Sequence, residues 1–161
     1  MKKLFLVFIL FVGFTSLTVA QDYKIGPGVR LGITPGISVK YFLDETSVIE
    51  GMFTSRWHGA IITGLYEKQY RILEEFGLSA FFGGGGHIGR WEGYDMHPWY
   101  KDDKNHYAAG LDAIVGLEYF FKAMPMSVSL DWKPEFNFVK TEQLQIVEAA
   151  ITFRWLLFSE K

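Results

Sequence analysis

The chain has 161 residues, with no cysteine, 17 glycines and 17% aromatic residues. This length indicates a single domain, and the lack of cysteine excludes a disulfide framework. The formal net charge of -2 provides no broad basic surface, which argues against nucleic-acid binding.

The first 20 residues predict a cleaved signal peptide. Met1-Lys2-Lys3 precedes an apolar run over residues 4–14, and Thr18-Val19-Ala20 supplies a small-x-small cleavage site. The apolar run is too short to cross a bilayer as a helix. We therefore expect export and a mature domain over residues 21–161; the alternative is an N-terminal membrane anchor.

Alternation of apolar and polar residues predicts the strands that follow. Successive side chains of a strand point to opposite sides, so a period of two indicates a strand between two different environments. Thr34-Pro35-Gly36 suits a tight turn after the first strand. The alternating segments are residues 24–33, 37–43, 48–57, 60–70, 76–89, 109–121, 126–138 and 147–155.

The fourth and fifth segments show the pattern less clearly. An inward Glu67 and Gln69 would place Ile62 and Tyr66 outside, but the pattern alone does not fix this register. The run over residues 83–86 is all glycine, and in a narrow barrel such glycines would make room for bulky neighbours. A G-x-G-x-x-G pattern begins at Gly84, but no helix follows it, so we predict no nucleotide site.

The segment 126–138 is the clearest. Its apolar side holds Met126, Val128, Leu130, Trp132, Pro134, Phe136 and Phe138, and its polar side holds Ser127, Ser129, Asp131, Lys133, Glu135 and Asn137. Pro134 cannot donate a ladder hydrogen bond, so we expect a bulge or a missing pair there.

Segments of about ten residues with this alternation are typical of transmembrane β-barrels, which pair every backbone polar group internally. We predict an all-β fold: an eight-stranded antiparallel up-and-down barrel with the apolar faces against lipid. Both ends of the barrel would be periplasmic, and the segment 90–107 would form the long outer loop. Outward aromatic residues would form two girdles: Trp57, Phe136 and Phe138 at the outer rim, and Tyr41, Tyr119, Phe121 and Trp155 at the inner rim.

The polar faces predict a charged lumen. Buried charges are tolerable only when they are paired and hydrogen-bonded, so we expect a structural ion-pair network that fills a closed interior. A conduction or proton pathway is the alternative, although eight strands leave little open bore. The predicted network comprises Arg30, Lys40, Glu50, Arg56, Glu67, Asp112, Glu118, Asp131, Lys133, Glu135, Glu148 and Arg154.

The long loop carries an aromatic cluster that could contact sugar, a lipid headgroup or a partner protein, or could fold over the barrel mouth. Its predicted contact residues are Trp91, Tyr94, His97, Trp99 and Tyr100. His87, His97 and His106 with the loop aspartates have no spacing typical of a closed metal site, so we predict neither metal nor cofactor.

No motif indicates catalysis. Only His87 with Glu118 and either Ser79 or Ser129 has the residue types of a lipid-modifying barrel enzyme, and spacing alone cannot show the required geometry.

The segments 77–87, 110–119 and 129–134, the last reading Ser-Leu-Asp-Trp-Lys-Pro, resemble small outer-membrane barrel proteins with the architecture of OmpA, OmpX and OmpW. This resemblance implies the barrel fold and an outer-membrane location. We expect a monomer whose partners are outer-membrane lipid and the barrel-insertion machinery. We expect a structural, adhesive or membrane-integrity role rather than an enzyme. The alternatives are a lipid-modifying barrel enzyme and a soluble lipocalin-like periplasmic barrel with an apolar ligand cavity.

Overall fold

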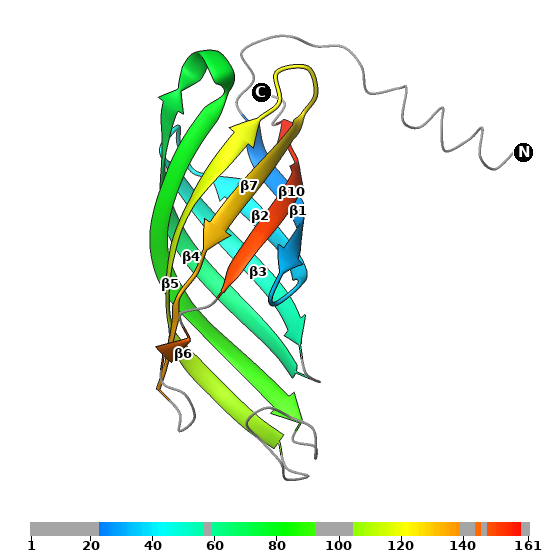
Figure 1. Ribbon diagram of the computed structural model, residues 1–161, viewed down its shortest axis with the longest axis vertical. Coiled ribbons are helices and arrows are strands. Elements are labelled where there is room, and N and C mark those ends of the chain that lie inside the picture. Colours follow the sequence, from blue (N-terminus) through cyan, green and yellow to red (C-terminus); the bar gives the residue numbers. More distant parts are fainter. Residues whose placement is uncertain (1–22, 57–58, 93–104, 139–143, 146–147, 159–161) are drawn as a thin grey trace, which may run out of the picture.

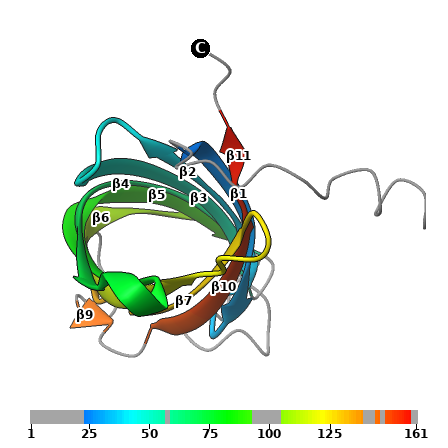
Figure 2. The same cartoon turned by 90° about the horizontal axis from the view of Figure 1, so that it is seen from above.

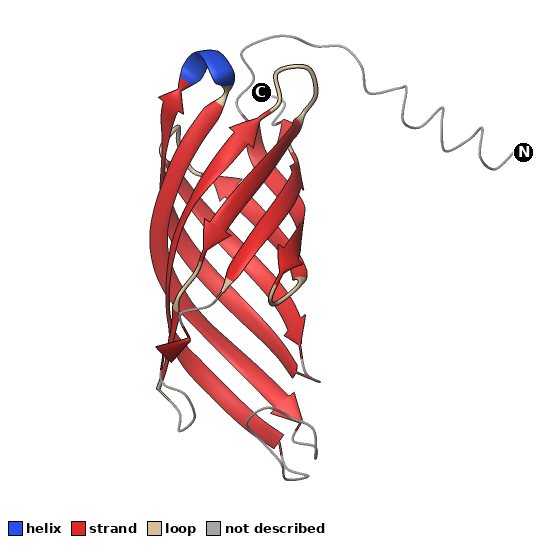
Figure 3. Ribbon diagram, in the orientation of Figure 1, coloured by secondary structure: helices blue, strands red, loops and turns tan. Residues whose placement is uncertain are grey.

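The computed structural model describes residues 23–56, 59–92, 105–138, 144–145 and 148–158. Its strands close into a single antiparallel barrel (Figures 1 and 2). Nearly all of the described chain is strand, and its one helical segment is the short 3-10 turn η1 (Glu74–Phe76) (Figure 3). None of the described helical structure is long and apolar enough to cross a membrane.

The barrel wall has eight antiparallel strand positions, which we call paths because two of them are divided into shorter strands. Six are single strands, each paired with the next: β1 (Tyr23–Gly32), β2 (Gly36–Phe42), β3 (Ser47–Arg56), β4 (Gly59–Leu73), β5 (Leu78–Glu92) and β6 (Asn105–Phe120). The seventh path is β7 (Met126–Trp132) with β8 (Glu135–Asn137), and the eighth is β9 (Leu144–Gln145) with β10 (Ala149–Trp155) and β11 (Leu157–Phe158). The pairing of β1 with β10 and β11 closes the ring, as predicted.

The two faces of the seventh path show which side is enclosed. Leu130 and Trp132 are 58% and 45% exposed, whereas Asp131 and Lys133 are 3% and 2% exposed. The apolar face therefore points outward and the ionic face inward, as predicted for a membrane barrel. A lipocalin-like barrel requires the opposite arrangement, so that alternative is wrong.

The structure shows which side chains of β4 point inward, a question that the sequence pattern left open. Glu67 and Gln69 are buried, while Ile62 and Tyr66 are about half exposed on the outside. Ile62 lies opposite Phe53 of β3 and Ile88 of β5, so three neighbouring strands present apolar side chains on the same face.

Strands β5 and β6 are longer than the sequence predicted. The segment 90–107 was expected to be loop, but Trp91 pairs with His106 and Glu92 with Asn105. The prediction failed because glycine and alanine interrupt the alternation on both sides of this segment, although Trp91 remains in phase with the inward-facing His87. β4, β5 and β6 consequently extend beyond the β1–β2 hairpin at one end of the barrel (Figure 1).

Pro134 interrupts the seventh path without changing its register. Trp132 lies opposite Val115, and Glu135, three residues later, lies opposite Asp112, three residues earlier. The Pro134 carbonyl still accepts a hydrogen bond from the Ala113 N–H. The expected missing pair is thus confirmed, and no bulge accompanies it.

The interior also contains an apolar cluster beside the predicted charges. Met52, Leu65, Phe81 and Ile114 are all at most 3% exposed and in mutual contact. Gly116 makes room for this cluster, because a Cβ there would lie 2.5 Å from Phe81 Cζ. The expected role of lumen glycines is therefore confirmed at Gly116.

The glycine run 83–86 serves a different purpose. Cβ atoms on Gly83 and Gly85 would lie within 2.3 Å of backbone oxygens of β4. These glycines let the backbones of β4 and β5 approach closely, rather than accommodating bulky side chains.

The barrel ends differ in their connections. Short turns, η1, the start of β1 and the end of β11 lie together at one end, and the end of β5 and the start of β6 lie at the other (Figure 1). Outward aromatic pairs occur near each end: Tyr119 with Phe121 at a centroid distance of 5.0 Å, and Phe136 with Phe138 at 5.8 Å. Trp57 lies outside the described residues.

Candidate functional site: the ion-pair network of the lumen

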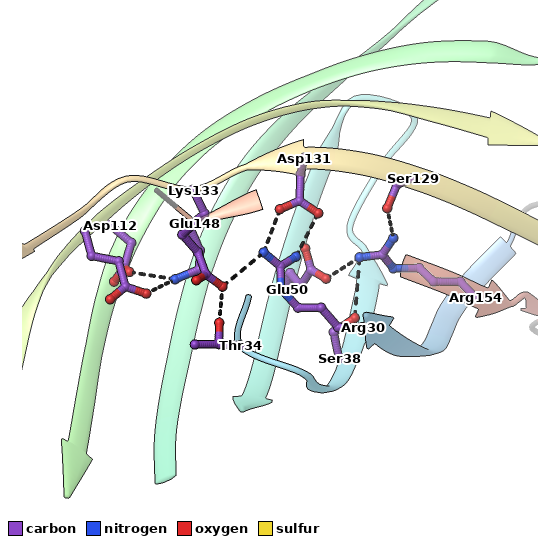
Figure 4. A network of polar contacts seen from close by, with 11 residues as sticks. Arg30, Thr34, Ser38, Glu50, Asp112, Ser129, Asp131, Lys133, Glu148 and Arg154 are labelled. Atoms are coloured by element: carbon purple, nitrogen blue, oxygen red, sulfur yellow. Dashed lines mark hydrogen bonds and ion pairs between the residues drawn. The ribbon is translucent and has the colours of Figure 1, made fainter. Parts of the chain in front are cut away.

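The first ion pair of the network joins a residue of β1 to a residue of β7. Arg30 is fully buried and makes two contacts of 2.7 Å with the Asp131 carboxylate, one from each terminal nitrogen (Figure 4). Its Nη2 also lies 3.7 Å from Glu148 Oε1, and the Thr34 hydroxyl donates to that same carboxylate. One charge-assisted hydrogen bond and one further ion-pair contact thus link β1 to β7, which lie on either side of β10 in the wall.

A second cation is Lys40 on β2. Its ammonium nitrogen lies 2.9 Å from Glu67 and 3.2 Å from Glu118, and it stands 3.8 Å from the Phe81 ring centroid. Glu118 in turn accepts hydrogen bonds from Ser127 at 2.6 Å and Gln69 at 3.2 Å. This fully buried ammonium is thus paired with two carboxylates and an aromatic face, as a buried charge requires.

Arg154 on β10 links this group to β3. Its guanidinium contacts Glu50, lies 3.6 Å from Glu118 and donates to the Ser129 hydroxyl at 2.6 Å (Figure 4). Ser38 of β2 accepts a longer bond of 3.4 Å. One arginine therefore joins side chains from four other strands.

A third group lies farther from the short-turn end. Lys133 contacts Glu135 and lies 3.2 Å from Asp112 Oδ1. His87 Nδ1 lies 2.8 Å from the second oxygen of Asp112, and His87 Nε2 lies 2.9 Å from Asn137 Oδ1. These side chains come from β5, β6 and the seventh path, and all are at most 5% exposed.

An open pocket of about 500 Å³ lies at the short-turn end. Phe42, Phe120 and Gln69 are among its lining residues. Because Gln69 also donates to Glu118, the pocket ends on the ionic groups around Lys40. This arrangement gives the barrel an open mouth above a filled interior.

The structure brings together every predicted network residue whose side chain it describes; the side chain of Arg56 lies outside the described part. The sequence reasoning missed the uncharged partners. Five of them lie in phase with a charged residue of their own strand, which was an available signal; Thr34 lies in the turn after β1, and β5 has no charged residue in phase with His87. The missed partners are Thr34, Ser38, Gln69, His87, Ser127, Ser129 and Asn137.

The residues considered for catalysis do not form a nucleophile–base pair. Both ring nitrogens of His87 face Asp112 and Asn137, Glu118 is held by Lys40 and Ser127, and Ser129 accepts from Arg154. A hydroxyl nucleophile needs a base within hydrogen-bond reach, and neither Ser129 nor Glu118 has His87 as its partner here.

One predicted surface-loop contact requires correction. Trp91 is 8% exposed, lies in β5 and points inward over Gly59, where a Cβ would lie 2.2 Å from its ring. It therefore belongs to the interior and not to an exposed loop. The other four predicted contacts, Tyr94, His97, Trp99 and Tyr100, lie outside the described residues.

Comparison with known proteins supports the architecture. The chain is similar to the N-terminal β-barrel domain of Pseudomonas aeruginosa OprF, with a TM-score of 0.66 and 11% sequence identity, over 84% of this chain and all of that domain. No family model matches the sequence, and no curated protein matches it either. The similarity therefore concerns the fold, which is that of the eight-stranded transmembrane barrels.

Proposed function

We propose that this protein is an integral outer-membrane barrel with a non-conducting lumen and a structural role in the membrane. The observation that carries this proposal is a distribution of side chains opposite to that of a soluble protein: apolar residues cover the outside, and paired ions fill the inside. The apolar outer surface can contact lipid tails. The closed barrel pairs the backbone N–H and C=O groups, for which lipid offers no hydrogen-bond partner.

The ion pairs support a closed interior. Arg30, Lys40 and Arg154 are at most 1% exposed, and each contacts at least one carboxylate contributed by another strand. Ion pairs inside an eight-stranded barrel leave little room for an open channel. Adhesion and membrane integrity remain the roles consistent with a barrel that transports nothing.

Conductance tests this proposal directly. Full-length protein reconstituted into planar bilayers is expected to give no large, stable channels. The conductance of variant R154M, which lacks one cation of the lumen, is measured in the same way. Comparison with the wild type shows whether the assay detects a partly emptied lumen. Sustained wild-type conductance of porin size would refute the closed lumen.

The proposed orientation places the 93–104 connection outside the cell and the short turns in the periplasm. The natural chain lacks cysteine, so single substitutions report on each end without background. N105C is expected to react with a membrane-impermeant maleimide in intact cells, whereas M124C, in an exposed short turn, should react only after lysis. The reverse pattern would invert the orientation.

We also propose that the barrel is a monomer that reaches its lipid environment through the barrel-insertion machinery. Recovery with the outer-membrane fraction, and release only by detergent, is the expected result of fractionation. Recovery in the soluble periplasm would contradict the membrane assignment.

A further inference from the structure

Three strands bring an imidazole and two carboxylates together in the lumen. Asp112 of β6 lies directly opposite Glu135 of β8, and His87 of β5 lies opposite Gly110, the neighbour of Asp112 on the same face. A Cβ on Gly110 would lie 2.7 Å from His87 Cε1. The glycine therefore leaves space for the imidazole, whose Nδ1 lies 2.8 Å from Asp112 Oδ2 and whose Nε2 lies 2.9 Å from Asn137 Oδ1.

The geometry suits a metal ion. One ligand atom each from His87, Asp112 and Glu135 can be chosen so that all lie within 4.8 Å of one another, and all three residues are buried. Ligand atoms around tetrahedral zinc, with bonds of about 2.0–2.2 Å, are roughly 3.3 Å apart. Small side-chain rotations would therefore complete a three-ligand site, with a fourth position left for water.

The charge of this part of the lumen favours an additional cation. Among the described side chains, the carboxylates of Asp112, Asp131, Glu135 and Glu148 contact the cations Arg30 and Lys133, and Asp112 also contacts the His87 imidazole, which can bind a metal only through an unprotonated ring nitrogen. Arg30 is already occupied by Asp131 in two contacts. Uncompensated carboxylates are costly in a buried setting. With the His87 imidazole neutral, as metal binding requires, four carboxylates face two cations, and this difference of two matches the charge of a divalent ion.

We infer that His87, Asp112 and Glu135 form a binding site for a divalent transition-metal ion, and that Lys133 is its built-in competitor. Mixed imidazole and carboxylate donors suit Zn²⁺ best among common ions, while Ca²⁺ and Mg²⁺ prefer all-oxygen sites. The Lys133 ammonium contacts both carboxylates, which is the position a metal ion would take.

If a metal ion displaces the Lys133 ammonium, another carboxylate of the lumen is available to pair with it. The backbone N–H of Lys133 donates to the Glu148 backbone carbonyl at 2.7 Å, so the two residues are neighbours. The partners of the Glu148 carboxylate include the Thr34 hydroxyl and the more distant Arg30. When a metal ion occupies the two carboxylates, the ammonium can turn toward Glu148. Metal binding thus exchanges one ion pair for another without leaving the ammonium unpaired.

Zn²⁺ titration of the full chain in detergent micelles, after removal of metal with a chelator, tests the site by calorimetry. We expect one Zn²⁺ per chain in the wild type. H87A should weaken binding by about tenfold or more, since loss of even a supporting group around a metal costs 10–100-fold. K133M should bind more tightly than the wild type, because it removes the competing ammonium.

H106A is the matched control, since His106 lies on β6 but outside the cluster. Circular dichroism verifies that each variant is still a barrel, and K133M keeps the test decisive if H87A does not fold, because it retains all three ligands. Equal affinity in wild type, H87A and K133M overturns the inference. So does loss of Zn²⁺ in H106A, or the absence of one-to-one binding in both wild type and K133M.

Discussion

The two faces of the seventh path differ in whether a charged side chain stabilises or destabilises the barrel. On the lumen face, Asp131 and Lys133 are enclosed and stabilised by partners on other strands. On the outer face, Leu130 and Trp132 are 58% and 45% exposed to the surrounding medium. Removing a charge should therefore damage the lumen face, and adding one should damage the outer face.

The largest effect is expected for R154M. This substitution leaves Glu50 and Glu118 without the guanidinium that both contact. Breaking a buried ion pair from one side costs about 3–5 kcal/mol, so the free energy of unfolding in urea, measured in lipid vesicles, should fall by that amount.

The double variant R154M/E50Q sharpens this result. It removes the charge of Glu50, which R154M leaves without its ion-pair partner, whereas Glu118 keeps Lys40. The double variant should therefore recover part of the lost stability. A single R154M variant as stable as the wild type would show that the lumen is hydrated rather than filled.

A charge on the outer face gives the next largest effect. L130R places a cation on the lipid-facing side of the central part of the seventh path, where such substitutions cost about 2–4 kcal/mol. F138R, near the end of the same path, should cost only about 0–1 kcal/mol. Equal losses in the same unfolding assay would contradict the position of the membrane along this path.

Two glycine-to-alanine substitutions compare the faces without any charge. A Cβ on Gly116 would press against Phe81 and lie 2.6 Å from the Leu130 carbonyl oxygen, whereas one on Gly51 would meet nothing within 4 Å. G116A should cost about 1–3 kcal/mol through overpacking, and G51A should leave the free energy of unfolding nearly unchanged. Thermal or urea unfolding of the pair distinguishes an enclosed lumen from an open one.

The smallest effect belongs to neither face. In the β2–β3 turn, hydrogen bonds from Ser47 and Thr46 hold the pKa of the exposed Asp44 below its ordinary value. A lowered folded-state pKa stabilises the fold above the unfolded-state value, about 3.9, and this contribution is lost as the pH falls through the folded-state pKa. D44A should thus be less stable than the wild type at neutral pH, by an amount that shrinks in acid.

Much of the barrel could be predicted because alternation is a local property. The register of the seventh path and the inward placement of Arg30, Glu118 and Arg154 follow from a period of two. The particular ion pairs could not be predicted, because Arg30 and Asp131 are 101 residues apart and meet only when the barrel closes.

The failures have a common physical cause. The strand around Trp91 exists because β5 pairs with β6, and its own glycine and alanine neighbours give no alternation. The cluster of His87, Asp112 and Glu135 was missed for the same reason, since its members come from three strands. Both features depend on pairing between distant segments.

Quenching of Trp132 tests most directly whether the apolar face contacts lipid. In a variant that keeps Trp132 and replaces the other four tryptophans by phenylalanine, brominated lipids should quench the fluorescence strongly, and aqueous acrylamide should have little effect. Strong quenching by acrylamide, with no effect of the brominated lipids, would contradict the membrane-facing assignment on which the whole account depends.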